Sequence, residues 1–373
     1  MIDSYSSYSY LLLIFALLST TSCTRHADPI ACTEMTISPT DTILVLDADT
    51  LTEILSIGEF QLDQGRVLVL DNTARKISYI DLPSGISSSF GFPGEAPGGL
   101  MTPVAFISGG GLVRVVDIGN GMVCFDSTGE YREDLSFFES NLPLNLRPAI
   151  GSGFIGLRSE NSFDENDALI AKVTVGLFAD SPGASIEYCS FFLPLDLEDI
   201  GTSIYQALNS VCYAADESNG DVFISYSSTD RISVKGYRMS GEEFTSIEEE
   251  CERVGRQAAE IESEIIGLES HPLLGRFASM IDIGEFKPQV ASIGVDSLGQ
   301  VWLETASSGC PAFLVLSHSL EDTVMTVIAP ELNMASSSYD IRIGSSGIIV
   351  NETCDDGGAM LYRMAFDPER GGS

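Results

Sequence analysis

The sequence has little positive charge. Lysine and arginine together number 19, against 54 aspartate and glutamate residues, and the formal net charge is −35 at pH 7. Proteins that bind nucleic acid need basic side chains to neutralise phosphate, and anionic lipid head groups are repelled by such a charge. We therefore expect no nucleic-acid partner. We interpret the acidic surface as a device for solubility at high ionic strength rather than as a site for one basic partner.

Sequence motifs for zinc binding and serine hydrolysis are also missing. The histidines (His26, His271 and His318) are scattered, the cysteines form no C-x-x-C pair, and no G-x-S-x-G segment is present. Zinc ligands usually occur at short spacings, and the nucleophile elbow of a serine hydrolase needs that glycine-flanked serine. The sequence therefore predicts no catalytic residue. The cysteines after Cys23 either pack as small apolar residues or pair outside the cytoplasm.

Long apolar runs are confined to the start of the chain. Residues 11–18 read LLLIFALL, which is too short to span a bilayer, and small polar residues then lead to Cys23. This layout looks like a bacterial lipoprotein signal at 1–22, with Cys23 as the lipid attachment site and 23–41 as a tether. No Lys or Arg precedes Leu11, so an ordinary secretory signal with an incidental Cys23 stays open. Either interpretation predicts an exported chain. The first adds membrane contact through a lipid anchor only, in the periplasm or at the cell surface.

Glycine turns recur along the rest of the chain. Each joins two apolar, β-branched segments, which favours a tight hairpin because glycine adopts the positive φ that such turns need. Six copies are found, at 60–70, 104–116, 150–155, 211–225, 293–303 and 341–350. Short strands at periods of about 40 to 50 residues are typical of propeller blades. We predict an all-β fold, a six-bladed β-propeller over 42–370.

Further strands fit the same repeat. A third apolar segment and a second turn follow most of the hairpins, as at 77–85, 122–129, 234–241, 313–321 and 360–370. The early run Thr42–Leu46 has no unit of its own. We expect it to pair into the last blade and so close the ring without an open edge. The only tryptophan, Trp302, lies in an inner-strand pattern and is predicted to pack between blades.

One segment follows a helical period instead. Ile247, Cys251, Val254, Ala258, Ile261, Ile265 and Leu268 are spaced three and four residues apart, and Ser246 with Glu249 has the pattern of a capping box. The spacing predicts an amphipathic helix over 246–268, within a helical insertion at about 246–275. We expect its apolar stripe to cover the rim of the propeller. Docking of a partner helix is the alternative.

A glycine- and proline-rich loop precedes the second hairpin. It contains Gly91, Gly94, Pro97 and Gly98, and the following strand ends on Asp117, with Asn120 in the next turn. These residues resemble the NHL-like six-bladed β-propellers, especially the lipoproteins of that type common in Bacteroidota. Ala96 and Gly99 depart from the family's loop. The resemblance implies a fold and a cell-envelope location, but it transfers no reaction. We interpret the loop as a crossing between blades rather than an anion cradle.

The acidic residues include a candidate metal site. Asp216, Asn219 and Asp221 resemble an oxygen cage for Ca²⁺, although Asp or Asn before Gly is ordinary turn chemistry and no EF-hand loop is completed. We therefore favour a structural turn and expect no cofactor, with Ca²⁺ as the alternative.

The predicted function is binding or scaffolding of a protein, small-molecule or glycan ligand. A metal-dependent propeller hydrolase or lyase with channel carboxylates is the alternative, and a ring-shaped adaptor in an envelope complex is a third interpretation.

Overall fold

Antiparallel β-sheet makes up most of the structure. The computed structural model describes residues 33–46, 54–63, 65–81, 85–136, 142–166, 168–179, 184–269, 271–334, 337–345, 347–354 and 358–366. Predicted segments 1–22 and 23–32, with Cys23, lie outside these residues. None of the helices in the described part is long and apolar enough to cross a bilayer.

Three sheets have four strands each, in chain order from the first strand to the last. The first contains β2 (Glu59–Asp63), β3 (Arg66–Asp71), β4 (Lys76–Asp81) and β5 (Gly85–Phe90). The second contains β11 (Leu144–Pro148), β12 (Phe154–Phe163), β13 (Leu169–Phe178) and β14 (Ile186–Pro194). The third contains β15 (Val211–Ala215), β16 (Val222–Tyr226), β17 (Arg231–Tyr237) and β18 (Glu243–Glu250).

The remaining sheets have three, two and eight strands. The three-stranded sheet contains β8 (Pro103–Gly109), β9 (Leu112–Asp117) and β10 (Gly121–Asp126), and the short parallel pair contains β6 (Phe92–Pro93) and β7 (Gly99–Leu100). The eight-stranded sheet has the order β19-β20-β21-β22-β1-β25-β24-β23. Its strands are β1 (Thr33–Leu46), β19 (Val290–Val295), β20 (Val301–Thr305), β21 (Ala312–Leu316), β22 (Thr323–Ile328), β23 (Ser337–Gly344), β24 (Gly347–Cys354) and β25 (Ala359–Phe366).

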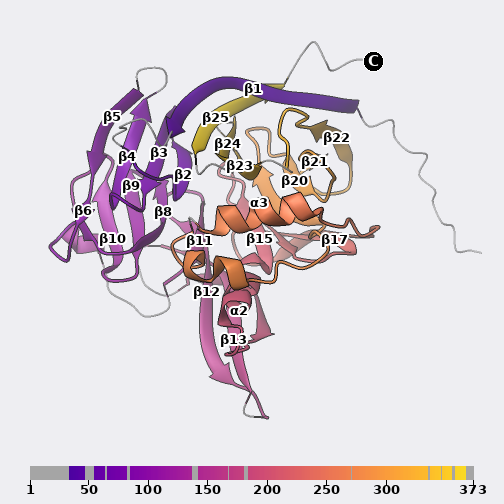
Figure 1. The fold of residues 1–373 in the computed structure, drawn as a ribbon, viewed down its shortest axis with the longest axis horizontal. Coiled ribbons are helices and arrows are strands. Elements are labelled where there is room, and N and C mark those ends of the chain that lie inside the picture. Colours follow the sequence, from indigo (N-terminus) through magenta and orange to yellow (C-terminus); the bar gives the residue numbers. More distant parts are fainter. Residues whose placement is uncertain are drawn as a thin grey trace, which may run out of the picture. The chain divides into compact units, whose positions relative to one another are not determined.

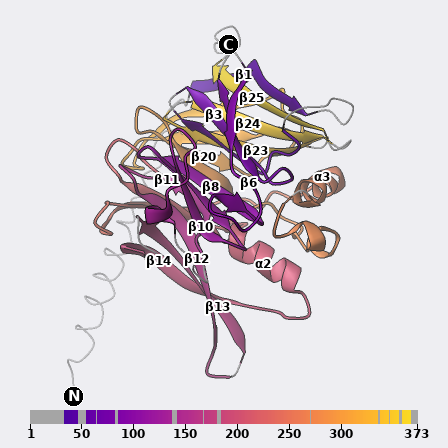
Figure 2. The ribbon, with the colours of Figure 1, turned by 90° about the vertical axis from the view of Figure 1, so that its left-hand side faces the viewer.

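The sheets follow one another in a propeller-like arrangement (Figures 1 and 2). The first strands contact one another in sequence: β2 with β8, β8 with β11, β11 with β15, β15 with β19, and β19 with β23. Apolar clusters fill the spaces between neighbouring sheets, as where Leu68 and Leu70 of β3 pack with Phe106 and Val115 of the next sheet. Each predicted glycine turn does join two antiparallel strands, which confirms that prediction. The eight-stranded sheet is continuous, so this part of the structure is not divided into separate four-stranded blades.

Strand β1 pairs antiparallel with β25, with Thr42 opposite Tyr362 and Leu46 opposite Ala359. The prediction that Thr42–Leu46 joins the last part of the chain is confirmed. The strand begins earlier than predicted, at Thr33, within the segment assigned to a tether. Ile37 explains the extension, because its fully buried side chain packs in the core with Tyr362 and Met364.

The predicted helix over 246–268 is wrong in its first half. Residues Glu243–Glu250 form β18, where Ser246 lies opposite Lys235 of β17, so Ser246 and Glu249 make no capping box. Pairing with β17 completes a four-stranded sheet and outweighs the local helical period, because strand formation depends on tertiary context. Helix α3 runs only over Ala258–Glu269.

A second helix was not predicted. Helix α2 (Ile200–Asn209) begins after Asp199, whose carboxylate accepts a hydrogen bond from the Thr202 backbone N–H at 3.2 Å. Two short 3₁₀ helices, η1 (Glu133–Leu135) and η2 (Gly275–Met280), complete the helical elements of the described residues. Leu208 of α2 packs with Leu274 and Ile281 beside η2, and η2 contacts α3. Figure 2 shows α2 and α3 on the same side of the sheets.

Candidate functional site

The first strands of the sheets surround a cavity of about 1060 Å³. Residues from β2, β8, β11, β15, β19 and β23 line it, and helix α3 adds Glu260, Ser263 and Glu264. Because these strands come from consecutive repeats, side chains far apart in the sequence meet around one space. The cavity is therefore the candidate ligand site of the fold.

Arg342 of β23 organises one wall of the cavity. Its Nη2 atom lies 2.9 Å from Asp340 Oδ2 and 2.7 Å from Glu59 Oε2, and its Nη1 donates a hydrogen bond to the Phe60 carbonyl oxygen at 3.0 Å. Burial disfavours the charged guanidinium, but Asp340 and Glu59 outweigh it and raise the pKa of Arg342. Burial also opposes ionisation of Asp340, yet Arg342 holds the pKa of that carboxyl below its usual range. This ion cluster ties β23 to β2.

Helix α3 presents polar groups to the cavity. Its two buried residues are Glu260 and Ser263, rather than members of the predicted apolar stripe. Ile261 and Leu268 pack against the apolar cluster around η2, and Leu268 also borders the cavity. The helix therefore covers the cavity with its polar side, contrary to the expected role of an apolar rim cover.

Two ion pairs hold this helix in place. Lys287 Nζ lies 2.8 Å from Glu260 Oε1 and donates to the Ser307 carbonyl oxygen at 2.5 Å. Burial raises the pKa of Glu260, but the Gln257 backbone N–H and Lys287 outweigh burial, and the net pKa is lowered. Arg256 Nε lies 3.0 Å from Glu264 Oε1, and its Nη1 also donates to the Phe286 carbonyl oxygen. Both basic groups are thus matched by an acid.

Glu304 of β20 is a protonation site in the cavity wall. Ser292 Oγ, directly across the strand pair, donates to Glu304 Oε2 at 2.8 Å. Burial raises the pKa of Glu304 to about 7 and the Asp340 charge adds to the rise, whereas the Ser292 hydrogen bond opposes it. Near neutral pH this carboxyl is therefore present in both its acid and its ionised form, and it can donate or accept a hydrogen bond.

Cys212 of β15 lies between charged neighbours. Burial raises the pKa of its thiol to about 12, while the charge of Arg147 lowers it and the charge of Glu304 raises it. The thiol therefore stays protonated at neutral pH and is a poor nucleophile. It serves as a small, weakly polar part of the wall.

Arg147 of β11 reaches the same cavity. Its hydrogen bond, from Nη1 to the Leu146 carbonyl oxygen, spans 2.9 Å. No carboxylate of the described residues forms an ion pair with it. Sequence reasoning did not single out Arg147, because nothing in its local sequence distinguishes it from a surface arginine.

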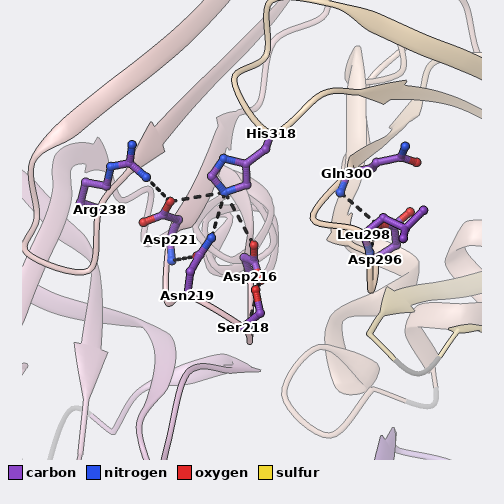
Figure 3. A network of polar contacts seen from close by, with 9 residues as sticks. All are labelled: Asp216, Ser218, Asn219, Asp221, Arg238, Asp296, Leu298, Gln300 and His318. Carbon is purple, nitrogen blue, oxygen red and sulfur yellow. Dashed lines mark hydrogen bonds and ion pairs between the residues drawn. The ribbon is translucent and has the colours of Figure 1, made fainter.

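The predicted metal residues lie elsewhere, in the turn between β15 and β16 (Figure 3). Asp216 accepts hydrogen bonds from the Ser218 backbone N–H at 2.8 Å and hydroxyl at 2.6 Å, and the Asn219 side-chain oxygen accepts from the Asp221 N–H at 2.8 Å. These hydrogen bonds are local contacts within one turn, and Ca²⁺ binding by the three residues stays untested.

Arg238 and His318 face the same carboxylates. Arg238 Nη1 lies 2.5 Å from Asp221 Oδ2, and His318 Nε2 lies 3.3 Å from the same atom and 3.6 Å from Asp216 Oδ2. The Arg238 guanidinium thus competes with any cation for the Asp221 carboxylate. Among the described residues, no three His, Cys, Asp or Glu side chains are placed to hold a metal ion.

His318 instead connects two sheets. It lies in the turn between β21 and β22, its ring stacks on Phe244 of β18 at 5.5 Å, and it contacts the β15–β16 turn. Beside it, Asp296 accepts hydrogen bonds from the Gln300 backbone N–H at 2.9 Å and from the Trp302 indole at 2.9 Å. Trp302 is buried in the core, packed against Phe313. This region is a structural contact between sheets.

The loop with Gly91, Gly94, Pro97 and Gly98 runs from β5, at the edge of one sheet, to β8 of the next. Gly91, Gly94 and Gly98 have positive φ angles of 79°, 143° and 81°. Asn120 Nδ2 donates to the Gly94 and Gly99 carbonyl oxygens at 3.1 and 2.9 Å. The loop's backbone is thus held by the protein's own side chain.

Comparison with solved structures gives distant resemblances. No family model matches the sequence, and no curated protein matches it. A solved structure of a candidate exported protein from Bacteroides fragilis has 10% identity and a TM-score of 0.40, covering 90% of this chain and 100% of that one. The structure of BBS1N in complex with ARL6DN, soaked with mercury, has 12% identity and a TM-score of 0.33, covering 87% and 97%. Neither resemblance is close enough to assign a function.

Proposed function

We propose that the chain is an exported six-bladed β-propeller that binds a small polar ligand in its central cavity. The count of six treats the eight-stranded sheet as two blades, one of β19 to β22 and one of β23, β24, β25 and β1. The contact between β19 and β23 supports this division, because it repeats the contact between the first strands of the other sheets.

The orientation of helix α3 is the observation that carries the binding proposal. A helix that only covered a core would bury its apolar residues. Here Glu260 and Ser263 are 2% and 4% exposed and line the cavity, whereas Ile261 and Ile265 are only partly buried. Burying polar side chains is costly unless they have partners, and Glu260 has them in Lys287 and the Gln257 N–H; the cap is thus polar and satisfied. A polar occupant, such as a hydrophilic metabolite or a glycan, matches this cap.

An NHL-like repeat is part of the proposal. Asp71 and Asp117, at the ends of β3 and β9, are both fully buried and accept hydrogen bonds from backbone N–H groups of the preceding loop. The same residue thus performs the same task in two successive sheets. This recurrence supports descent of the two sheets from one repeat unit.

Export and lipid attachment at Cys23 complete the proposal. They rest on the apolar run at 11–18 and on the small residues that precede Cys23. The low number of lysines and the acidic surface are compatible with an extracellular or periplasmic environment.

Blocking the cavity tests the binding proposal. Ala291 of β19 is exposed and lines the cavity, so Ala291→Trp would fill part of it without displacing a packed neighbour. Leu298→Trp, in the exposed turn of the same sheet, is the matched control. A mixture of neutral sugars, amides and carboxylates would be screened by saturation-transfer NMR. We expect binding to the wild type and the control but not to Ala291→Trp. Equal binding by all the proteins, or by none, would contradict the proposal.

A further inference from the structure

One basic side chain of the cavity lacks the ion pair that the others form. Arg342, Arg256 and Lys287 each form an ion pair with at least one carboxylate, at 2.7 to 3.0 Å. Arg147 lines the same cavity and has no such partner among the described residues. In a chain with 54 acidic residues and 19 basic ones, an arginine that faces a polar cavity without a direct ion pair is unusual. A carboxylate that its charge influences is Asp340, whose pKa it helps to lower against the effect of burial, and Asp340 is already paired with Arg342.

The backbone around Arg147 is specially shaped. The pairing of β11 with β12 shifts register between Leu144 and Arg147, and Asn145 has a φ of 50°, in the left-handed region. The Tyr213 hydroxyl of β15 donates to the Asn145 carbonyl oxygen at 2.7 Å, and Asn145 Nδ2 donates to the Leu208 carbonyl oxygen at 3.0 Å. A non-glycine residue with positive φ costs free energy and persists where its surroundings fix it. This bulge is thus held from β15 and α2, and it sets the direction of Arg147.

The neighbouring wall disfavours a doubly charged anion. Cys212 lies on the adjacent strand β15 and stays neutral, and the Glu304 carboxyl beyond it is protonated in part near neutral pH. Asp340 faces the cavity as an anion and would repel a doubly charged phosphate more than a carboxylate. A guanidinium binds a carboxylate through two parallel hydrogen bonds.

We propose that Arg147 is the anchor for the carboxylate group of the small ligand bound in the central cavity. This inference rests on the proposed binding function and adds the chemical class of the ligand. The rest of the ligand would lie toward Ser292 and helix α3, whose polar groups can accept or donate hydrogen bonds to its hydroxyl or amide groups.

The test uses benzoate as the carboxylate probe and benzamide as its neutral counterpart of the same shape, with the purified full chain. Phenylglyoxal labelling of Arg147 would be followed by mass spectrometry. The exposed Arg276 is the internal control. We expect benzoate, but not benzamide, to slow the labelling of Arg147 by about tenfold, with no change at Arg276. This measurement needs no variant and so does not depend on a substitution that could unfold the protein.

Variants give a second readout. Arg147→Ala should weaken benzoate binding by about tenfold or more. Arg147→Lys should also lose most of the binding, because lysine cannot form the bidentate hydrogen bonds of a guanidinium. The control Arg276→Lys should bind benzoate as the wild type does. Equal protection by benzoate and benzamide, no protection by either, or full benzoate binding by Arg147→Ala would overturn the anchor. If neutral compounds still bind and Ala291→Trp blocks that binding, the proposed cavity is supported and only the role of Arg147 is refuted. If no compound binds, both proposals are refuted.

Discussion

Lys287 Nζ and Glu260 Oε1 lie 2.8 Å apart, and the two side chains are only 6% and 3% exposed. This pair joins α3 to the segment before β19. Removing one partner of a buried ion pair leaves an unpaired charge and costs about 3 to 5 kcal/mol. We therefore expect Lys287→Met to lower the free energy of unfolding by about that amount, measured by urea denaturation.

Two comparisons make this prediction specific. The double variant Lys287→Met with Glu260→Gln should be more stable than Lys287→Met alone, because no charge then stays buried. Lys235→Met, which breaks a surface pair with Glu243, should cost about 1 kcal/mol or less. An equal loss of unfolding free energy in Lys287→Met and Lys235→Met would show that the buried pair stabilises the fold no more than a surface pair does.

The same pair predicts a pH dependence. Because the pKa of Glu260 is lowered in the folded state, its contribution is present above the ordinary glutamate pKa of about 4.3 and is lost as the pH falls through the lowered value. Hydrogen exchange of the α3 amides should therefore accelerate in that acidic window. Glu260→Gln should remove the acceleration, and an unchanged profile in that variant would argue against the assignment.

The effect of Glu304 on the free energy of unfolding should have the opposite pH dependence. Its pKa is raised to about 7, so its favourable contribution is present below the ordinary pKa of about 4.3 and is lost as the pH rises through 7. Glu304→Gln should therefore be more stable than the wild type at pH 8, by about 1 to 3 kcal/mol, with a smaller difference at pH 5. Denaturation at both pH values checks this, with the exposed Glu321→Gln as a control. A difference that is the same at both pH values would contradict the raised pKa.

Asp117, at the end of β9, should be a sensitive carboxylate because it holds the loop between β5 and β8. It accepts four backbone hydrogen bonds of 2.7 to 3.0 Å, from Met101, Thr102, Gly119 and Asn120. Asp117→Asn keeps the shape but replaces an acceptor oxygen by a donor, which should cost about 2 to 4 kcal/mol. The exposed Asp134→Asn should cause no measurable change in the denaturation midpoint. Similar midpoints for the two variants would refute this role.

Ring closure can be tested at Ile37. This residue of β1 is fully buried against side chains of β25. Ile37→Ala should lower the free energy of unfolding by about 2 to 5 kcal/mol, whereas the exposed neighbour Asp41→Ala should have little effect. A small effect of Ile37→Ala on thermal unfolding would mean that β1 adds little to the fold.

Lipid attachment is tested at Cys23. Membrane fractionation of cells that produce Cys23→Ser should move the protein from the membrane to the soluble fraction, while Cys310→Ser should stay with the membrane. Unchanged retention of Cys23→Ser would refute attachment at that residue.

The sequence predicted the hairpins because their signal is local. Gly65 and Gly299 have φ angles of 84° and 74°, the conformation for which glycine is selected in turns. Ser246 and Glu249 misled because their spacing fits a helix, while the decisive contacts come from β17. The cavity residues could not be predicted from the sequence for the same reason. Arg147 and Glu304 acquire their roles only when strands far apart in sequence meet around one space.

The pairing of β1 with β25 also sets the order in which the protein can be completed. The first described strand, β1, cannot complete its pairing until the last strand of the described chain has been synthesised. Its other neighbour, β22, is synthesised earlier, so the edge of β1 that faces β25 is the one left uncovered until then. For an exported chain this means that the ring is finished only after translocation has delivered both ends to the same compartment. A binding cavity inside such a ring would become functional last, and only in chains that are whole.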